Sequence, residues 1–456
     1  MADHESSAES SPEPSPRSGR EPGGADDVAA EVVDICRDLI RIDTSNFGDA
    51  GGPGERKAAE HVAALLDDVG IEATLHEASP GRTNVVAQWG GAGDRTDGLL
   101  VHGHLDVVPA EASDWAVDPF SGEVQDGYVW GRGAVDMKDF DAMVLSVVRA
   151  RQRAGRLPER PVTLVFTADE EAGGHHGAEP LLRDHRDLVE HCTEAVGEVG
   201  GWSATVRGRR MYLIEAAEKG MAWMRLTARG RAGHGSMIND DNAVTRLAAA
   251  VARIGAHRWP VTLTPTMRTL LAAVGELAGT EATPDNALEL IEEFGPAARM
   301  IGATLSHVSN PTQLDAGYKV NVIPTEATAH VDGRFLPGHE EEFHATLAEL
   351  IGPGIDVDYL SLQRPWETPY DGALVDAITR SLLAEDPDAV VAPYLLSAGT
   401  DAKHFGKLGI RTYGFAPLRL PADLDFTALF HGVDERVPVD GLEFGARVMD
   451  RFFDEV

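Results

Sequence analysis

The stretch Leu99-Leu100-Val101-His102-Gly103-His104-Leu105-Asp106 begins with three apolar residues and continues with two histidines and an aspartate. A second apolar run, at 162–166, is followed closely by an acidic triplet at 169–171. Short apolar runs of this kind are typical of parallel strands that are buried on both faces of a sheet. Because 142–152 has the pattern of a crossover helix, we expect an α/β fold with a mixed, largely parallel sheet flanked by helices.

The first polar cluster follows the strand predicted at 99–101, and ligands of such sheets bind beyond the carboxyl ends of the strands. Zinc sites use neutral imidazoles, and a carboxylate behind the ring fixes its tautomer and raises its basicity. Residues 102, 104 and 106 share one face of an extended segment. We therefore assign His104 as a metal ligand and Asp106 as its carboxylate partner, and we expect His102 to be a hydrogen-bonded histidine at the strand end.

The second cluster, Asp169-Glu170-Glu171, stands directly after the strand predicted at 162–166. Adjacent carboxylates repel one another, and burying them without a cation is costly. A metal resolves this conflict, because one carboxylate can bind the ion while its neighbour takes a proton from metal-bound water. The alternative interpretation is a solvated acidic loop, as expected in a chain this acidic.

Three further candidates are scattered along the chain: Asp136 within the glycine-containing segment 131–138, Glu198 before a glycine pair, and His431 near the C-terminus. Glycines permit unusual backbone angles close to a site. Taken alone, Asp136 is better explained as a structural turn residue, and the other two signals are weak.

The chain of 456 residues carries a formal net charge of −34. This excess argues against nucleic acid or an anionic membrane as a partner. No stretch approaches the roughly 18 uninterrupted apolar residues of a membrane helix. Only Cys36 and Cys192 are present, which argues against a disulfide framework and for a reducing compartment. We therefore expect a cytoplasmic protein that acts on a small molecule.

A chain of this length is expected to form two or more domains. Residues 1–26 are rich in Ser, Pro, Glu and Gly and are predicted to be disordered. We expect a catalytic domain in two parts, 27–218 and 364–456, with a smaller α+β lid or dimerisation domain inserted at 219–363. Within the insertion, 255–308 is longer than a simple connection requires.

Together and in this order, the motifs resemble those of the co-catalytic zinc family that contains bacterial glutamate carboxypeptidase, aminoacylases, acetylornithine deacetylase and succinyl-diaminopimelate desuccinylase. The similarity extends from about residue 28 to residue 456. It implies two divalent metal ions, zinc or alternatively cobalt or manganese, bridged by Asp136. It further implies His104 and Glu198 at one ion and Glu171 and His431 at the other. Glu170 matches the general base of the family, Asp106 its supporting carboxylate, and the Asp136–Met137 peptide its cis bond.

The resemblance also covers the inserted domain. His234 matches a histidine that stabilises the tetrahedral oxyanion, while Asn321, Arg334 and the pair Gly399-Thr400 match substrate-holding elements. Taken by itself, Arg334 could equally form an ordinary surface ion pair. In dimeric relatives, the histidine that matches His234 reaches the site of the neighbouring subunit. The extra residues in 255–308 resemble a branch with a longer lid, which would supply such contacts within one chain, so a homodimer through the inserted domain stays open.

The implied activity is hydrolysis of an amide or peptide bond next to a free carboxylate, as in dipeptidases and carboxypeptidases, by a hydroxide that bridges two metals. The first alternative is an N-acyl-amino-acid deacylase of the acetylornithine or succinyl-diaminopimelate type, because the chemistry at the carbonyl is the same. A more remote alternative is a catalytically silent metal-binding protein. The presence of every implied ligand argues against it.

Overall fold

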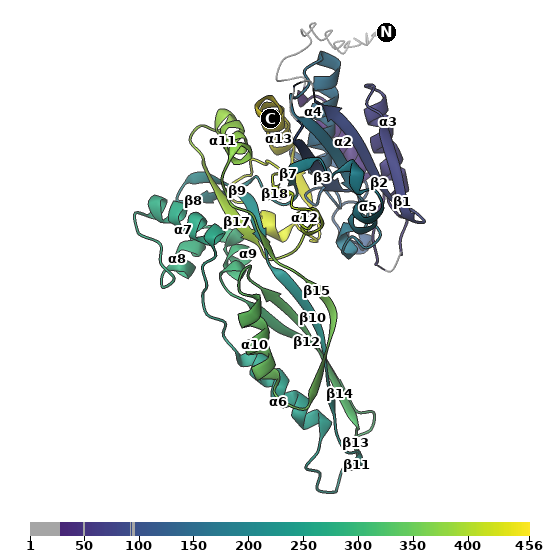
Figure 1. Cartoon of the computed structure of the whole chain (residues 1–456), viewed down its shortest axis with the longest axis vertical. Helices are drawn as coiled ribbons and strands as arrows, with labels where there is room; N and C mark the ends of the chain where they lie inside the picture. The colour runs from purple at the N-terminus through teal and green to yellow at the C-terminus, as the bar shows by residue number, and fades with distance from the viewer. Residues whose placement is uncertain (1–27, 49–50, 92, 94–95) are drawn as a thin grey trace, which may run out of the picture.

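The structure, a computed structural model, describes residues 28–48, 51–91, 93 and 96–456. Figure 1 shows a broad body, in which the C-terminal helix lies, and a narrow arm that projects from this body. The segment 1–26, predicted to be disordered, lies outside the described residues.

The body is built around a ten-stranded sheet in the order β1-β2-β6-β3-β7-β18-β9-β16, with β8 and β17 also paired to β9. Its central strands β6, β3, β7 and β18 run parallel, whereas β1, β2 and β16 pair in antiparallel fashion. The strands of this sheet are β1 (Ala73–Ser79), β2 (Arg82–Gly90), β3 (Gly98–His104), β6 (Pro161–Thr167), β7 (Cys192–Gly197), β8 (Trp202–Val206), β9 (Arg209–Glu218), β16 (Trp366–Glu367), β17 (Val390–Leu396) and β18 (Arg411–Gly414).

Helices cover both faces of this sheet, which explains why every residue of β3 is buried. On one face, Leu100 packs in a cluster with Leu181 of α5 and Phe405 of α12. On the other face, Leu99 and Val101 join the main core below α2, α4 and α13. The predicted α/β class is thus confirmed. The helices of the body in these two layers are α2 (Val32–Ile40), α3 (Arg56–Asp67), α4 (Lys138–Ala154), α5 (Ala178–Asp184), α11 (Ala373–Glu385), α12 (Ala402–Gly406) and α13 (Val439–Glu455).

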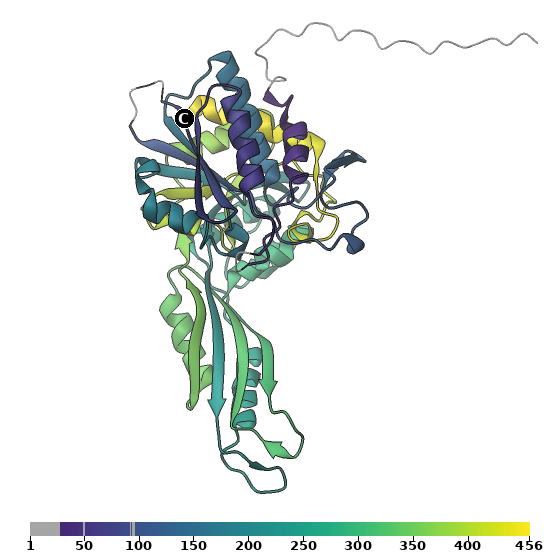
Figure 2. The ribbon, with the colours of Figure 1, turned by 90° about the vertical axis from the view of Figure 1, so that its right-hand side faces the viewer.

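The arm contains a separate antiparallel sheet in the order β12-β14-β10-β15, with α6 and α10 packed on it (Figure 2). Its own apolar core alternates along β14, where every second side chain is buried. The first strand of the arm is β10, and its last strand, β15, leads to β16 of the body. The arm elements are β10 (Gly220–Arg229), β11 (Gly233–His234), α6 (Ala243–Ala256), β12 (Val308–Ala316), β13 (Val322–Ile323), β14 (Glu326–Phe335), α10 (Glu340–Ile351) and β15 (Ile355–Gln363).

The extra segment within 255–308 does not lengthen the arm. It forms α7 (Pro265–Ala278), α8 (Ala287–Glu292) and α9 (Ala298–Gly302), and α7 packs against β17 of the large sheet. Leu270 and Ile301 belong to the main core of the body, not to the core of the arm. The interpretation of this segment as a longer lid is therefore wrong, because its apolar side chains are buried on the body.

A small sheet of β4 (Glu123–Gln125), β5 (Tyr128–Trp130) and β19 (Arg436–Pro438) lies at the side of the body. Cys36 and Cys192 are both buried, and neither forms a disulfide. Among the helices of the described ranges, none combines the length and apolar character needed to cross a bilayer.

Candidate metal centre

The candidate ligands meet at one edge of the large sheet, because β6, β3 and β7 are parallel neighbours whose carboxyl ends coincide. His104 is the last residue of β3. Glu170 and Glu171 begin a single 3₁₀ turn, η2 (Glu170–Ala172), that follows β6, and Glu198 comes directly after β7. Each predicted side chain thus stands at the end of a strand, where α/β proteins bind their ligands.

Asp136 lies between two histidines that are far apart in the sequence. Its Oδ1 is 3.0 Å from His104 Nε2, and its Oδ2 is 3.3 Å from His431 Nε2. Each histidine nitrogen also faces a second carboxylate: His104 Nε2 is 3.2 Å from Glu198 Oε2, and His431 Nε2 is 3.1 Å from Glu171 Oε2. The structure therefore brings all five predicted ligands together as two groups that share Asp136.

The chemistry of this donor set fits divalent cations. Potential ligand atoms of His104, Asp136 and Glu171 converge within 4.8 Å of one another, and so do those of His104, Glu170 and Glu198. Burial raises the pKa of Glu171 to about 7, with the charge of Asp136 adding to the effect, and its Oε1 has no hydrogen-bond partner among the described residues. A single ring N–H can serve two carboxylates only through a weaker bifurcated hydrogen bond, whereas a cation can bind all of these atoms.

Asp106, two residues further along the chain, orients the ring of His104. Its Nδ1 lies 3.0 Å from the backbone carbonyl oxygen of Asp106, whereas the nearer carboxylate oxygen of Asp106 is 3.6 Å away. A hydrogen bond from Nδ1–H to this carbonyl leaves the lone pair of Nε2 free for a metal. The partner of the ring is thus the Asp106 carbonyl rather than the predicted carboxylate.

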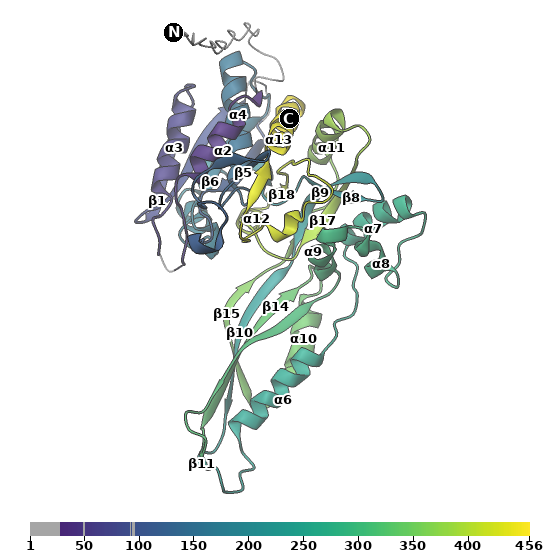
Figure 3. The same cartoon turned by 180° about the vertical axis from the view of Figure 1, so that it is seen from behind.

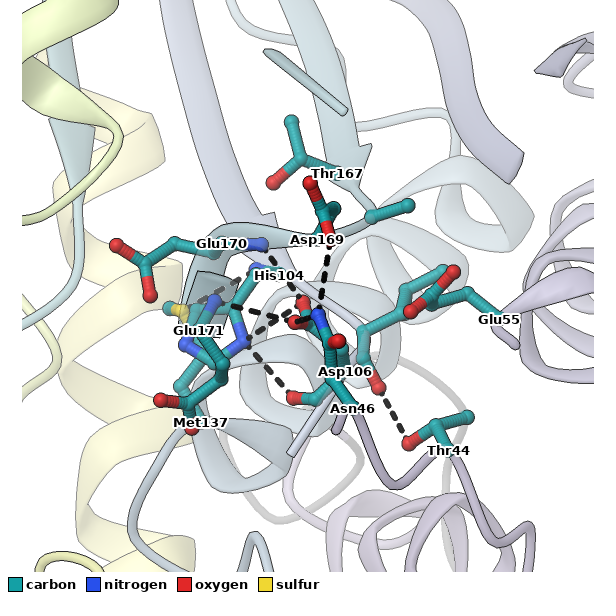
Figure 4. Close-up of polar contacts among 12 residues, drawn as sticks. Thr44, Asn46, Glu55, His104, Asp106, Met137, Thr167, Asp169, Glu170 and Glu171 are labelled. Atoms are coloured by element: carbon teal, nitrogen blue, oxygen red, sulfur yellow. Dashed lines mark hydrogen bonds and ion pairs between the residues drawn. The ribbon is translucent and has the colours of Figure 1, made fainter. Parts of the chain in front are cut away.

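The Asp106 carboxylate instead organises the turn that carries the catalytic candidates (Figure 4). Its Oδ1 accepts the backbone N–H of Glu170 at 3.0 Å, and its Oδ2 accepts that of Glu171 at 3.1 Å. The side-chain amide of Asn46 donates to Asp106 Oδ2 at 2.9 Å and to Asp169 Oδ1 at 3.0 Å. Asp106 therefore supports the position of both glutamates, in addition to that of His104.

This network continues into the body through Asn46, Arg82 and Glu55, which the sequence analysis did not single out. Arg82 donates to the Asn46 side-chain oxygen at 2.8 Å and forms a buried ion pair with Glu55. Asp169, whose φ is 63°, accepts the backbone N–H of His176 at 2.8 Å. Buried polar residues that carry no recognisable motif thus support the η2 turn, and their hydrogen bonds show this role.

A second missed residue, Glu435, holds the loop that presents Asp136. Its carboxylate accepts the backbone N–H groups of Gly133 at 3.0 Å and Val135 at 2.8 Å, and it pairs with Arg132 at 2.6 Å. The Asp136–Met137 peptide bond at the end of this loop is cis. Its position four residues after the candidate ligand His431 is the sequence signal that points to Glu435.

Glu170 is placed to handle a proton. Burial raises the pKa of its carboxyl well above its usual range, the charge of Glu198 adds to this effect, and the charge of Lys403 opposes it. Its side chain makes no hydrogen bond with any residue that the structure describes. A carboxyl with a raised pKa and no fixed partner can accept and return a proton near neutral pH.

His102 is buried beside Phe405, with ring centroids 4.7 Å apart. Burial lowers the pKa of His102 to about 4, so the ring is neutral. Its Nε2 has no hydrogen-bond partner within the described part of the chain. The expectation of a hydrogen-bonded histidine therefore fails at this nitrogen.

Two of the predicted arm residues lie far from the metal centre. His234 forms part of β11 at the end of the arm (Figure 3), where its Nδ1 is 2.8 Å from Ser236 Oγ. Asn321 is exposed next to it and pairs through its backbone carbonyl with Gly235. A single chain in this conformation therefore does not bring His234 or Asn321 to its own site.

The remaining substrate-holding candidates lie nearer the body. Arg334 on β14 forms an ion pair with Asp332 at 2.8 Å, so its guanidinium faces an internal carboxylate. Thr400 follows Gly399 in the loop after β17, and its backbone N–H donates to Glu218 at 3.0 Å. In this conformation Arg334 therefore forms an ordinary ion pair, which was the alternative to substrate binding.

Two adjacent groups of candidate cation ligands beside a carboxyl that can exchange a proton are the arrangement that metal-dependent hydrolases use. The comparisons with known proteins agree with this class. Residues 100–455 match the peptidase family M20/M25/M40, and the chain belongs to this family. It is therefore a hydrolase of the metallopeptidase and aminoacylase family, which acts on amide bonds.

Related sequences and structures cover nearly the whole chain. Aminoacylase-1 from Pongo abelii is 27% identical over 416 residues, which cover 89% of this chain and 90% of the relative. An N-fatty-acyl-amino acid synthase/hydrolase from Xenopus tropicalis is 27% identical, with 91% of this chain and 83% of the relative covered. The same fold occurs in an M20 family metallo-carboxypeptidase from Sulfolobus solfataricus, with a TM-score of 0.69, 18% identity and coverage of 93% and 98% of the two chains.

Proposed function

We propose that this protein uses two divalent metal ions to hydrolyse an amide or peptide bond next to a free carboxylate, as a dipeptidase or carboxypeptidase. The observation that carries the proposal is the position of Asp136 between His104 and His431, each of which also faces a glutamate. His104 and Glu198 would hold one ion, and Glu171 and His431 the other. Zinc is the expected metal, with cobalt and manganese as alternatives.

When bound, such ions polarise a carbonyl and lower the pKa of water toward neutrality. The residues of the chain handle the proton and the substrate. The Glu170 carboxylate takes a proton from the attacking water and returns it to the leaving nitrogen. Arg334 would exchange its bond to Asp332 for the substrate carboxylate, which its planar guanidinium can bind with two parallel hydrogen bonds.

We further propose that the protein acts as a homodimer in which His234 of one copy stabilises the oxyanion in the site of the other. This proposal is supported by the exposed position of His234 at the end of the arm, away from the metal centre of its own chain. The cytoplasmic location and the lack of nucleic-acid and membrane partners stay predictions from charge and cysteine content.

The second candidate function is an N-acyl-amino-acid deacylase. It is favoured by the aminoacylases among the relatives, which match 89% of this chain. Both candidates require the same attack on an amide carbonyl, and they differ only in the group on its acyl side.

The experiment is a substrate panel of dipeptides, N-acetyl amino acids and N-succinyl amino acids. Each is assayed with the protein as purified, after chelation, and after addition of zinc, cobalt or manganese. We expect activity to disappear with chelator, to return with metal, and to coincide with about two ions per chain. Chelator-resistant hydrolysis would contradict the metal mechanism, and a stoichiometry of one after reconstitution would contradict the paired site.

A further inference from the structure

A large cavity of about 820 Å³ lies where the arm joins the body. The cavity is lined by the end of β15, by β16, by α12 and by the start of β18. Figure 1 shows α12 near the junction from which β15 runs into the arm. His175, just after the η2 turn, lies at its edge. None of the ligand or proton-transfer roles proposed above uses the residues that line this cavity.

The cavity borders the turn that carries Glu170. A Cβ on Gly399 would lie 3.6 Å from Gln363 Oε1 and 3.8 Å from Lys403 Nζ, and both of these side chains line the cavity. On the other side, a Cβ on Gly173, the residue directly after η2, would lie 3.9 Å from Gln363 Nε2. The Gln363 amide therefore lies against both glycines, and the cavity that it lines begins beside the η2 turn.

The charge of the cavity is opposite to that of the chain as a whole. Its lining includes four Lys or Arg side chains and two Glu side chains, in a protein with a net charge of −34. Both glutamates are already engaged: Glu179 pairs with His175 at 2.9 Å, and Glu367 accepts the backbone N–H of Thr266 at 2.8 Å. An excess of positive charge therefore faces the cavity.

Two of the four cations have no partner of their own. Arg411 is bound to the Asp371 carbonyl and to Tyr413, and Lys407 lies 3.5 Å from His404. Lys403 and Arg364, in contrast, make no hydrogen bond or ion pair within 4.0 Å in the described part of the chain. The charge of Lys403 acts on the buried carboxyls of Glu170 and Glu218, but neither lies within ion-pair distance.

We propose that this cavity binds a second carboxylate of the substrate, with Lys403 and Arg364 as its counter-charges. The inference rests on the proposed function, because it names the substrate class of the same centre. The remaining lining includes Leu362, Trp366 and Ile410, which suit the methylene groups between the scissile amide and a distant charge. The preferred substrates are thus amides that carry two negative charges.

The second carboxylate can come from a dicarboxylic acyl group or from an acidic side chain. Three matched substrates separate these sources: N-acetyl-leucine has one carboxylate, N-succinyl-leucine adds one on the acyl side, and N-acetyl-glutamate adds one on the amine side. We expect kcat/KM for one of the doubly charged substrates to exceed that for N-acetyl-leucine by about tenfold or more, as a charge-assisted contact provides.

The variants Lys403→Met and Arg364→Gln test the counter-charges. Each should reduce the preference for the doubly charged substrate by about tenfold, and Lys403→Glu should reverse it. Lys57→Met, on the exposed face of α3, is the matched control and should keep the preference. If Lys403 acted only through Glu170, all three substrates would lose activity equally and the pH profile would shift. That result would overturn the inference.

A binding measurement keeps the inference testable apart from turnover. Glutarate is titrated calorimetrically into the metal-loaded protein, its Lys403→Met and Arg364→Gln variants, and the Lys57→Met control. We expect Lys403→Met and Arg364→Gln to bind glutarate at least about tenfold more weakly than the unchanged protein. The Lys57→Met control should bind glutarate as well as the unchanged protein does. Equal binding in all four proteins would overturn the cavity site. If glutarate binding depends on Lys403 but no amide is hydrolysed, the proposed function fails and the anion site stands.

Discussion

Glu170 is the residue that we propose as the proton carrier. Its carboxyl is buried, and its side chain makes no hydrogen bond with the described residues. We expect Glu170→Gln to keep the fold and about two metal ions while losing almost all turnover, since the amide has the same shape but cannot accept the proton. Steady-state kinetics together with metal analysis tests this. Activity comparable to that of the unchanged protein would remove Glu170 from the mechanism.

Asn46 tests whether the hydrogen bonds behind the η2 turn matter for catalysis. Its amide joins Asp106 to Asp169, and both carboxylates lose a donor in Asn46→Ala. We expect kcat to fall by about 10–100-fold at saturating metal, with a smaller change in KM, because the turn that positions Glu170 loosens. The exposed Asn310→Ala is the matched control. A loss of thermal stability with an unchanged kcat would assign Asn46 a purely structural role.

His307 makes stability depend on pH. Its buried Nδ1 accepts the backbone N–H of Leu336 at 3.1 Å, which requires a neutral ring. Burial and the nearby charges of Lys219 and His339 lower its pKa to about 4, and Glu342 opposes them. The unfolded ring titrates near 6.5. Between these values only the unfolded chain binds the proton, so the free energy of unfolding falls as pH falls from about 6.5 to about 4.

The measurable consequence is a difference between urea titrations at pH 7 and pH 5. The variant His307→Gln keeps an acceptor for the backbone N–H but cannot be protonated. Between pH 7 and pH 5, the free energy of unfolding of this variant should fall by about 1–2 kcal/mol less than that of the unchanged protein, after allowance for screening by solvent. His185→Gln, at an exposed position, serves as the control. Identical acid sensitivity in His307→Gln and the unchanged protein would contradict this account.

At the scale of elements, α7 tests which core the extra segment belongs to. Leu270 is fully buried in the main core, whereas Leu347 of α10 is buried in the core of the arm. Leu270→Ala should cost about 2–5 kcal/mol and destabilise the body, which carries the metal ligands. Leu347→Ala should destabilise the arm instead, and Leu288→Ala, at a side chain that is 59% exposed, should change little.

Hydrogen exchange of the amides in β3 and β14 distinguishes these outcomes. Faster exchange in β3 is expected for Leu270→Ala, and faster exchange in β14 for Leu347→Ala. If Leu270→Ala accelerated exchange in β14 alone, α7 would belong energetically to the arm despite its position.

At the scale of the whole molecule, the arm separates His234 from the metal centre of its own chain (Figure 3). We expect His234→Ala to lower kcat by about 10²–10³ with little change in metal content, because it removes an oxyanion donor. Mixing this variant with Glu170→Gln should restore part of the activity. A mixed dimer has one site with both an intact Glu170 and an intact His234 from its partner.

Light scattering of the same samples decides the interpretation. A dimer with rescue supports the arrangement in trans. If the protein is a monomer and the mixture shows no rescue, the trans hypothesis is wrong. His234 would then reach the metal centre only by closure of the arm within one chain. The variant Asn310→Ala, in place of His234→Ala, provides a control mixture at matched concentration.

The sequence alone was sufficient for the α/β class, and the order of its motifs, through their resemblance to a known family, indicated the set of candidate ligands. The apolar runs that lie within β3 and β6 are local signals, because burial on both faces of a sheet requires continuous apolar residues. His104 is the last residue of β3, and Glu171 and Glu198 come shortly after β6 and β7. For His104 and Glu171, adjacency in the sequence therefore predicts position in space.

Only the tertiary structure decided the supporting contacts. Asn46 contacts Asp106 and Asp169, and Glu435 contacts the loop before Asp136, across long separations in the chain. Such pairs depend on strand order and register, which a local pattern does not encode. The packing of α7 on the body and the distance of His234 from its own site have the same cause. Helical periodicity shows that a face is buried, but the tertiary fold determines which core covers it.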